Sequence, residues 1–129
     1  MNRNESGAVR GGVRMLLRGE GLAVFATASG LYFVGGGVWW VYALLLFVPD
    51  LSFIGYSAGN RLGAALYNAA HTYILPLAMG TAGLMLDIDW MQHVALIHLA
   101  HIGLDRSLGY GLKYADGFQH THFGRLGRG

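Results

Sequence analysis

The stretch that decides the fold is His98-Leu-Ala-His101-Ile-Gly-Leu-Asp105-Arg106, which begins inside an apolar segment and leads into a basic tail. In a helix, His98, His101 and Asp105 stand at positions i, i+3 and i+7 and share one face. Ionisable groups within apolar helices are costly, and they usually face the interior of a bundle. We therefore expect this helix to point a polar cluster inward.

The composition predicts a single domain whose surface faces lipid rather than water. Of the 129 residues, 53% are hydrophobic and 12% are charged, whereas a soluble domain carries roughly 25% charged residues. The 21 glycines fit this interpretation, because small residues let membrane helices approach closely. The absence of cysteine excludes disulfides, iron–sulfur clusters and cysteine-based zinc sites. Positive charge gathers at the two ends, which indicates membrane topology and not nucleic-acid binding.

We expect an all-α, multi-pass transmembrane bundle with four spans and short loops. Residues 1–14 form a flexible basic N-terminus, and residues 109–129 form an irregular basic tail in the cytoplasm. The four expected spans of the bundle 15–108 cover residues 15–34, 38–54, 62–86 and 90–108. Each lies within the range of about 17–25 residues that a helix needs to cross a bilayer.

Residues 20–50 allow one long helix or two shorter ones. Gly35-Gly36-Gly37 is the stretch that decides between these alternatives. Three glycines cost a helix about 3 kcal/mol relative to alanine, which favours a hairpin. The hairpin also places the arginine-rich segments on one side of the membrane and the acidic Asp87-Ile-Asp89 loop on the other, as the positive-inside rule requires. We expect a protein of the cell inner membrane with both termini in the cytoplasm.

Two prolines interrupt the apolar segments. Pro49 is followed by Asp50, and this pair predicts a break or a kink. Pro76 predicts a kink in the third span that frees a backbone carbonyl near Thr72.

Gly55, Gly59 and Gly63 form a small-residue face at intervals of four. Such a face suits close helix crossing, and it is the surface through which we expect any homo-oligomer to form. A flexible loop over residues 55–60 is the alternative, because Gly-Tyr-Ser-Ala-Gly-Asn also resembles a turn sequence.

Polar residues of different spans are expected to meet at one depth. His71 lies about 16 residues before the Asp87 turn and His101 about 14 residues after it, so at about 1.5 Å per residue both are about 21–24 Å from the turn. The expected cluster consists of Asp50, Asn68, His71, His101 and Asp105. Imidazoles and carboxylates bind zinc and other first-row divalent metals. The predicted metal ligands are His71, His101 and Asp105, with His98 and His122 as further candidates.

Three functions are open for such a cluster. The first is a structural or partner-binding membrane module, in which buried polar groups pair with one another and fix the helix packing. The second is a metal-dependent membrane hydrolase acting on a lipid-like substrate, because a bound metal can activate water. The third is a proton-coupled small-molecule transporter. The sequence assigns no catalytic residue.

Two basic residues, Arg106 and Lys113, lie near and beyond the end of the last expected span. Basic side chains at a cytoplasmic membrane surface contribute about 1 kcal/mol each to the binding of anionic lipid. Both side chains are therefore expected at lipid head groups. The lipid bilayer is the partner that the sequence predicts, and no nucleic acid is expected.

Four stretches and two short pairs of residues carry a family resemblance. They are Leu17-Arg18-Gly-Glu20-Gly-Leu, Pro49-Asp50-Leu-Ser-Phe-Ile-Gly55-Tyr56, Gly63-Ala-Ala-Leu-Tyr67-Asn68-Ala-Ala-His71-Thr-Tyr-Ile-Leu-Pro76, Ala100-His101-Ile-Gly-Leu-Asp105-Arg106-Ser-Leu-Gly109-Tyr110-Gly111-Leu-Lys113-Tyr114, Gly117-Phe118 and Thr121-His122. From about residue 15 to its end, the chain resembles a family of small bacterial membrane proteins catalogued as domain of unknown function 4260. The resemblance implies a multi-pass membrane protein and supplies no activity. Its motifs include all five residues of the expected cluster and His122, whereas His98 is not part of the pattern.

Overall fold

The computed structural model of the protein describes residues 11–112, 120–121 and 124–125. This part of the chain is helical apart from one antiparallel pair of very short strands. The elements are α1 (Gly11–Val34), α2 (Trp39–Leu45), the 3₁₀ helix η2 (Val48–Ala58), α3 (Asn60–His71), α4 (Ile74–Leu86), α5 (Asp89–Ser107), β1 (His120–Thr121) and β2 (Gly124–Arg125). The all-α class is confirmed, and the strand pair is the one regular feature described in a tail that was expected to be irregular.

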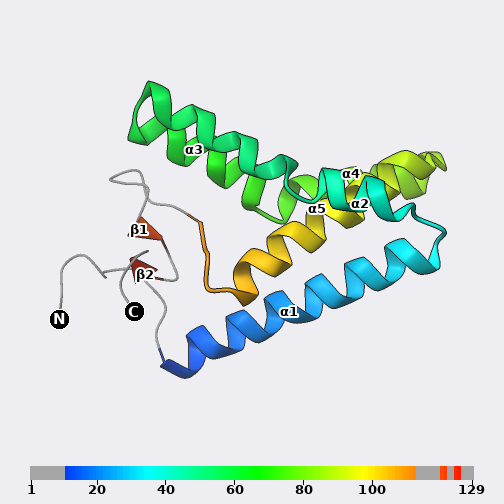
Figure 1. Cartoon of the computed structure of the whole chain (residues 1–129), viewed down its shortest axis with the longest axis horizontal. Helices are drawn as coiled ribbons and strands as arrows, with labels where there is room; N and C mark the ends of the chain where they lie inside the picture. The colour runs from blue at the N-terminus through cyan, green and yellow to red at the C-terminus, as the bar shows by residue number, and fades with distance from the viewer. Residues whose placement is uncertain (1–10, 113–119, 122–123, 126–129) are drawn as a thin grey trace.

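The helices run back and forth along one direction (Figure 1). The order is α1, then α2 with η2, then α3 with α4, and finally α5. The α1–α2 turn and the α4–α5 turn lie at one end of the molecule, and the η2–α3 turn lies at the other. This course groups the helices into four consecutive segments, and their crossing of a membrane stays a prediction.

The triple glycine separates α1 from α2, so the hairpin is confirmed and the single long helix is wrong. Helix α1 ends at Val34, and Gly36 adopts a φ of +84°. This left-handed conformation is costly for residues that carry a Cβ atom. The amide of Gly37 donates a hydrogen bond to the carbonyl of Tyr32 at 2.9 Å, which closes the end of α1.

The second segment differs from the continuous helix expected over residues 38–54. Helix α2 ends at Leu45, and a 3₁₀ helix starts at Val48 with Pro49 in its first turn. Proline suits this position because it has no N–H to leave unsatisfied. The expected break is therefore present, and the chain beyond it continues as η2 to Ala58 rather than as a flexible loop.

The third segment is divided into two helices, whereas the sequence predicts only a kink at Pro76. Helix α3 ends at His71, Thr72 is extended with a φ of −91° and a ψ of 150°, and α4 begins at Ile74. Pro76 then lies in the first turn of α4, where a missing N–H removes no helical bond. The interruption leaves the last carbonyls of α3 without partners inside their own helix.

Close packing joins the elements in two groups, α1 and α4 against α5, and η2 against α3. At the α1–α5 crossing, a Cβ atom on Gly103 would lie 2.6 Å from the carbonyl oxygen of Gly21, so only glycine allows this approach. The buried core beside it contains Ala28, Tyr32, Leu46, Ile97 and Ala100.

The glycine face expected to mediate homo-oligomers is used within the chain. A Cβ atom on Gly55 would lie 2.7 Å from the Leu66 side chain and 3.3 Å from the backbone of Gly63. Gly59, with a φ of +120°, forms the turn between η2 and α3. Oligomer formation through this face stays a prediction.

Large apolar side chains cover much of the outer surface. Met85 is 81% exposed, Ile74 75% and Trp39 73%. Soluble proteins rarely expose apolar patches on this scale. Two described stretches are long and apolar enough to cross a membrane, Trp39–Ala58 with 20 residues and Asn60–Leu86 with 27.

Candidate metal centre

Four side chains converge where η2, the end of α3 and the last third of α5 meet. Their ligand atoms all lie within 4.8 Å of one another. The members, which we call the His/Asp cluster, are Asp50, His71, His101 and Asp105. All four were predicted from sequence as parts of one polar cluster, and the structure brings them together.

The distances inside the His/Asp cluster are short and nearly uniform. The Nε2 atoms of His71 and His101 are 3.0 Å apart. The Oδ1 atom of Asp50 lies 3.3 Å from both nitrogens. The Oδ2 atom of Asp105 lies 3.4 Å from Nε2 of His71 and 3.3 Å from Nε2 of His101. Each imidazole nitrogen therefore contacts both carboxylates and the other imidazole.

Local sequence explains how each element delivers its ligand. Helix η2 begins at Val48, and Pro49 and Asp50 both lie in its first turn. The interruption after His71 makes this histidine the last residue of α3. His101 and Asp105 stand at i and i+4 on α5, a spacing that puts both side chains on one helix face.

The His71 ring has a defined orientation. Its Nδ1–H donates a hydrogen bond to the carbonyl of Tyr67 at 2.9 Å, one turn earlier in α3. In a neutral imidazole, donation from Nδ1 leaves Nε2 with a lone pair. Backbone bonds of this kind fix the tautomer of metal-binding histidines and orient their rings.

The His101 ring is held in the same way. It makes a hydrogen bond with the backbone of Leu46, which lies just after α2. Because Nε2 of His101 faces the cluster, Nδ1 is the ring nitrogen left for this bond. Both histidines then present unprotonated Nε2 atoms to each other and to two carboxylate oxygens. Such a set of electron-pair donors requires a cation among them, either a metal ion or a shared proton.

The walls of the cluster are largely closed. His71 and His101 are 1% and 2% exposed. The Tyr67 ring stacks on the His71 ring with centroids 3.8 Å apart, and the Phe53 ring lies 5.2 Å from the Tyr67 ring and 6.5 Å from the His71 ring. The Asp50 side chain, at 38% exposure, is the most open member, and Asp105 is 18% exposed.

Three other predicted site residues lie outside the convergence or outside the described residues. Asn68 is half-buried on α3, three residues before His71, and it is not one of the four converging residues. His98 donates from Nε2 to the carbonyl of Ala70, so it satisfies the interrupted end of α3 rather than joining the cluster. The side chain of His122 lies outside the described residues.

Arg106 has a position that the sequence reasoning missed. It is 8% exposed, its Nη2 atom donates to the carbonyl of His71 at 3.1 Å, and its guanidinium lies 5.6 Å from the centre of the Tyr73 ring. The kink that the sequence predicts at Pro76, with a freed carbonyl near Thr72, could have indicated this hydrogen bond, because basic side chains commonly satisfy the last carbonyls of a helix. Lys113, the other predicted head-group ligand, lies outside the described residues.

Comparison with known proteins identifies a family. The family model described as "Domain of unknown function (DUF4260)" matches residues 14–126, which is most of the chain. No curated protein and no solved structure matches the chain. The geometry of the site is therefore the guide to its chemistry.

Proposed function

Because the chain belongs to the DUF4260 family, whose description names no activity, we propose its function from its geometry. It is an integral membrane protein in which the His/Asp cluster binds one divalent transition-metal ion, and zinc is the first choice. The ion joins η2 and α3 to α5, which makes the chain a membrane module with a structural metal centre. The observation that carries this proposal is the 3.0 Å separation of the two imidazole Nε2 atoms between two carboxylates.

The cluster has the size that a tetrahedral ion needs. Zinc binds imidazole nitrogen and carboxylate oxygen at about 2.0–2.1 Å, so neighbouring ligand atoms around it are about 3.3–3.4 Å apart. The four distances between nitrogen and carboxylate oxygen are 3.3 to 3.4 Å, and the distance between the two nitrogens is 3.0 Å. A central ion also removes the repulsion between two neighbouring carboxylates.

The donor set favours a first-row transition metal over magnesium or calcium. Magnesium and calcium prefer six or more oxygen ligands, whereas half of the ligands here are imidazole nitrogens. Imidazole suits zinc, copper, iron and nickel. Zinc accepts four ligands without a preferred d-electron geometry, and a site with four protein ligands is typical of structural zinc.

The position of the cluster gives the ion a mechanical role. Helices η2 and α3 pack closely on each other, and their polar links to α5 include the cluster and the bonds that His98 and Arg106 make to the end of α3. A metal ion bound here would fix the position of η2 and α3 relative to α5. Removing the ion leaves two uncompensated carboxylates and is therefore expected to loosen this junction.

The membrane assignment rests on the apolar surface and on the back-and-forth course of the helices. We propose that α1, α2 with η2, α3 with α4, and α5 each cross the inner membrane, with both chain ends in the cytoplasm. The arginine-rich start of α1, the Arg61 turn and the end of α5 would then share the cytoplasmic side. The interruption at Thr72 is tolerated at such a depth because His98 and Arg106 satisfy the carbonyls that it frees.

X-ray absorption spectroscopy of the zinc-loaded protein tests the centre directly. We expect a first shell of about four nitrogen and oxygen ligands at about 2.0–2.1 Å, with the outer-shell signature of two imidazoles. A shell of five or six oxygen atoms without imidazole scattering would show that the ion is held by water and surface groups, and it would overturn the proposal.

A hydrolase is the second candidate, favoured by the exposure of Asp50. Catalytic zinc keeps one position for water, and Asp50 is the ligand whose side chain is most open, at 38%. If Asp50 leaves the metal, zinc held by the other three residues supplies the chemistry for hydrolysing a lipid-like ester. Release of a fluorescent fatty acid by zinc-loaded protein, lost in His101→Asn, would support this candidate, and no release would leave the structural role.

A further inference from the structure

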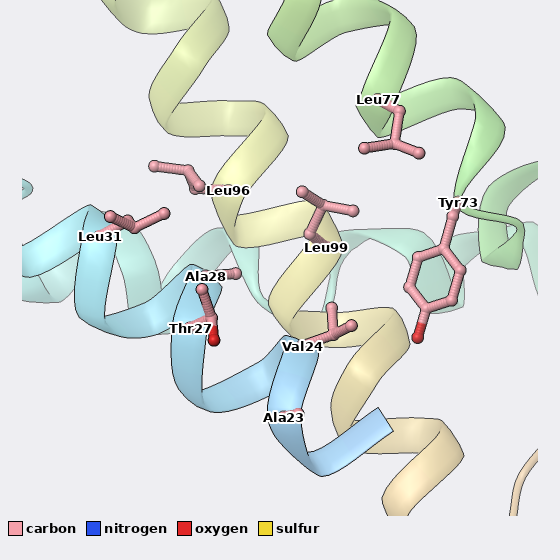
Figure 2. Close-up of a pocket in the computed structure, with 9 residues that line it drawn as sticks. All are labelled: Ala23, Val24, Thr27, Ala28, Leu31, Tyr73, Leu77, Leu96 and Leu99. Atoms are coloured by element: carbon pink, nitrogen blue, oxygen red, sulfur yellow. The ribbon is translucent and has the colours of Figure 1, made fainter. Parts of the chain in front are cut away.

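A groove formed by three hollows that share lining residues runs along α1. Helices α1 and α4 both pack on α5, and the groove lies between them (Figure 2). Its central hollow has a volume of about 450 Å³ and is lined by apolar side chains that include Leu31, Leu77 and Leu99. A second hollow of about 410 Å³ shares these three residues and extends the groove toward the α4–α5 turn.

The other end of the groove is charged. A third hollow, of about 410 Å³, shares Ala23, Val24 and Tyr73 with the central one and adds Glu20 and Arg106 to its lining. The Tyr73 ring lies beside the part of α1 that carries Ala23 and Val24, with its hydroxyl directed toward that helix (Figure 2). The groove therefore changes from a mainly apolar lining to a site with a carboxylate, a hydroxyl and a guanidinium.

The length of the apolar part suits one acyl chain. From Glu20 to Leu31 α1 advances 11 residues, or about 17 Å at about 1.5 Å per residue. One leaflet supplies half of the bilayer's hydrocarbon core of about 30 Å, or about 15 Å. An acyl chain lying along α1 would therefore place its head group beside Glu20 and Arg106.

We propose that this groove binds a phospholipid with a zwitterionic, amine-bearing head group. Arg106 binds the phosphate, because guanidinium groups match phosphate geometry and form charge-assisted hydrogen bonds with it. The bond from Arg106 to the His71 carbonyl uses one of five guanidinium N–H donors. Glu20 binds the ammonium group, and the acyl chain lies against Leu31, Leu77 and Leu99. Opposite charges on the two side chains favour this head group over a purely anionic one.

Native mass spectrometry of the full chain, released from detergent with equal amounts of phosphatidylethanolamine and phosphatidylglycerol, tests the proposal. We expect bound phosphatidylethanolamine to exceed phosphatidylglycerol by about fivefold, the upper end for a solvent-accessible ion pair. Glu20→Gln is expected to bring this ratio to about one, because it removes the partner of the ammonium group. An equal ratio in the unmodified protein, or a ratio unchanged by Glu20→Gln, would overturn the amine assignment.

Variants that fill the groove distinguish lipid bound in this site from the lipid that surrounds any membrane protein. Ala23 lies where the central and charged hollows meet, and Ala23→Phe is expected to lower total bound lipid at least tenfold. Leu77→Trp fills the same groove from α4 and is expected to lower bound lipid as well. Ala26→Phe adds the same ring to an exposed position of α1 outside the groove lining and is expected to leave bound lipid unchanged. Equal retention in all three variants would show surrounding lipid only. Metal content is measured in parallel, so loss of lipid and loss of the His/Asp centre are told apart.

Discussion

The Nε2 atom of His71 lies 3.0 Å from the Nε2 atom of His101, although the two residues are 30 positions apart in the chain. Each ring also bonds to backbone on its other side, His71 to Tyr67 and His101 to Leu46. Two protonated Nε2 atoms could not face each other at this distance, because both would be donors. The pair therefore shares at most one proton or holds a metal ion, and only a metal ion offers strong bonds to all four cluster members.

Removing one imidazole ligand is expected to abolish metal binding. His101→Asn shortens the side chain and deletes the nitrogen that contacts both carboxylates. Metal content should fall from about one ion per chain to below about 0.2 by elemental analysis, since a site with three remaining ligands and an unbalanced charge binds far more weakly.

A matched control lies on the same helix. His98→Gln keeps a side-chain donor toward the carbonyl of Ala70 and leaves the cluster intact. Its metal content should stay near one ion per chain. If His98→Gln loses as much metal as His101→Asn, the loss reflects general disruption of α5, and the cluster assignment is wrong.

Chelation is expected to destabilise the fold. A ligand that binds only the folded state stabilises it by about 2.7 kcal/mol at 100 times its dissociation constant and by about 4.1 kcal/mol at 1,000 times. Unfolding in detergent, followed by circular dichroism with and without a chelator, should show a loss of this size. His101→Asn should show no difference between the two conditions. Equal chelator sensitivity in both proteins would contradict a stabilising role for the metal.

The α1–α5 crossing is expected to reject even a methyl group. A Cβ atom on Gly103 would lie 2.6 Å from the Gly21 carbonyl oxygen and 2.6 Å from the Phe25 amide nitrogen. Because both neighbours are backbone atoms, Gly103→Ala should destabilise the protein by about 1–3 kcal/mol. Gly30→Ala on α1 meets no atom within 4 Å and should stabilise the helix by up to about 1 kcal/mol. Similar unfolding midpoints for the two variants would contradict this packing.

Topology is testable by labelling, because the chain contains no cysteine. Val34→Cys lies before the α1–α2 turn and Asp89→Cys lies after the α4–α5 turn. Both should react with an impermeant maleimide added to intact spheroplasts, in which the outer face of the inner membrane is accessible. Arg61→Cys after the η2–α3 turn should react only after the membrane is opened. Labelling of Arg61→Cys in intact spheroplasts together with no labelling at Asp89→Cys would contradict four crossings with cytoplasmic ends.

Much of the fold follows from local sequence. The cost of three consecutive glycines separates α1 from α2, and the apolar run between Asp89 and Ser107 gives α5 nearly its observed bounds. Depth counting from the Asp87 turn placed His71 and His101 at one level, and the structure joins them. These successes share a cause, because helix rise and glycine propensity act within a single segment.

The features that sequence reasoning missed depend on contacts between segments. A kink was expected at Pro76, whereas α3 ends at His71. That complete break is tolerated because His98 and Arg106, both on α5, bond to the freed carbonyls. From its own segment alone, His98 is predicted as a candidate metal ligand and Arg106 as a side chain at lipid head groups. A single segment does not reveal which distant side chain will satisfy its unpaired backbone.

The most direct test of the account is the metal content of the full-length protein, purified without a histidine tag and without chelators. Elemental analysis should find about one divalent transition-metal ion per chain, because a zinc site with four protein ligands is normally filled. Less than about 0.2 ions per chain, unchanged after incubation with zinc and removal of the excess, would contradict the metal centre and leave a shared proton as the bond between His71 and His101.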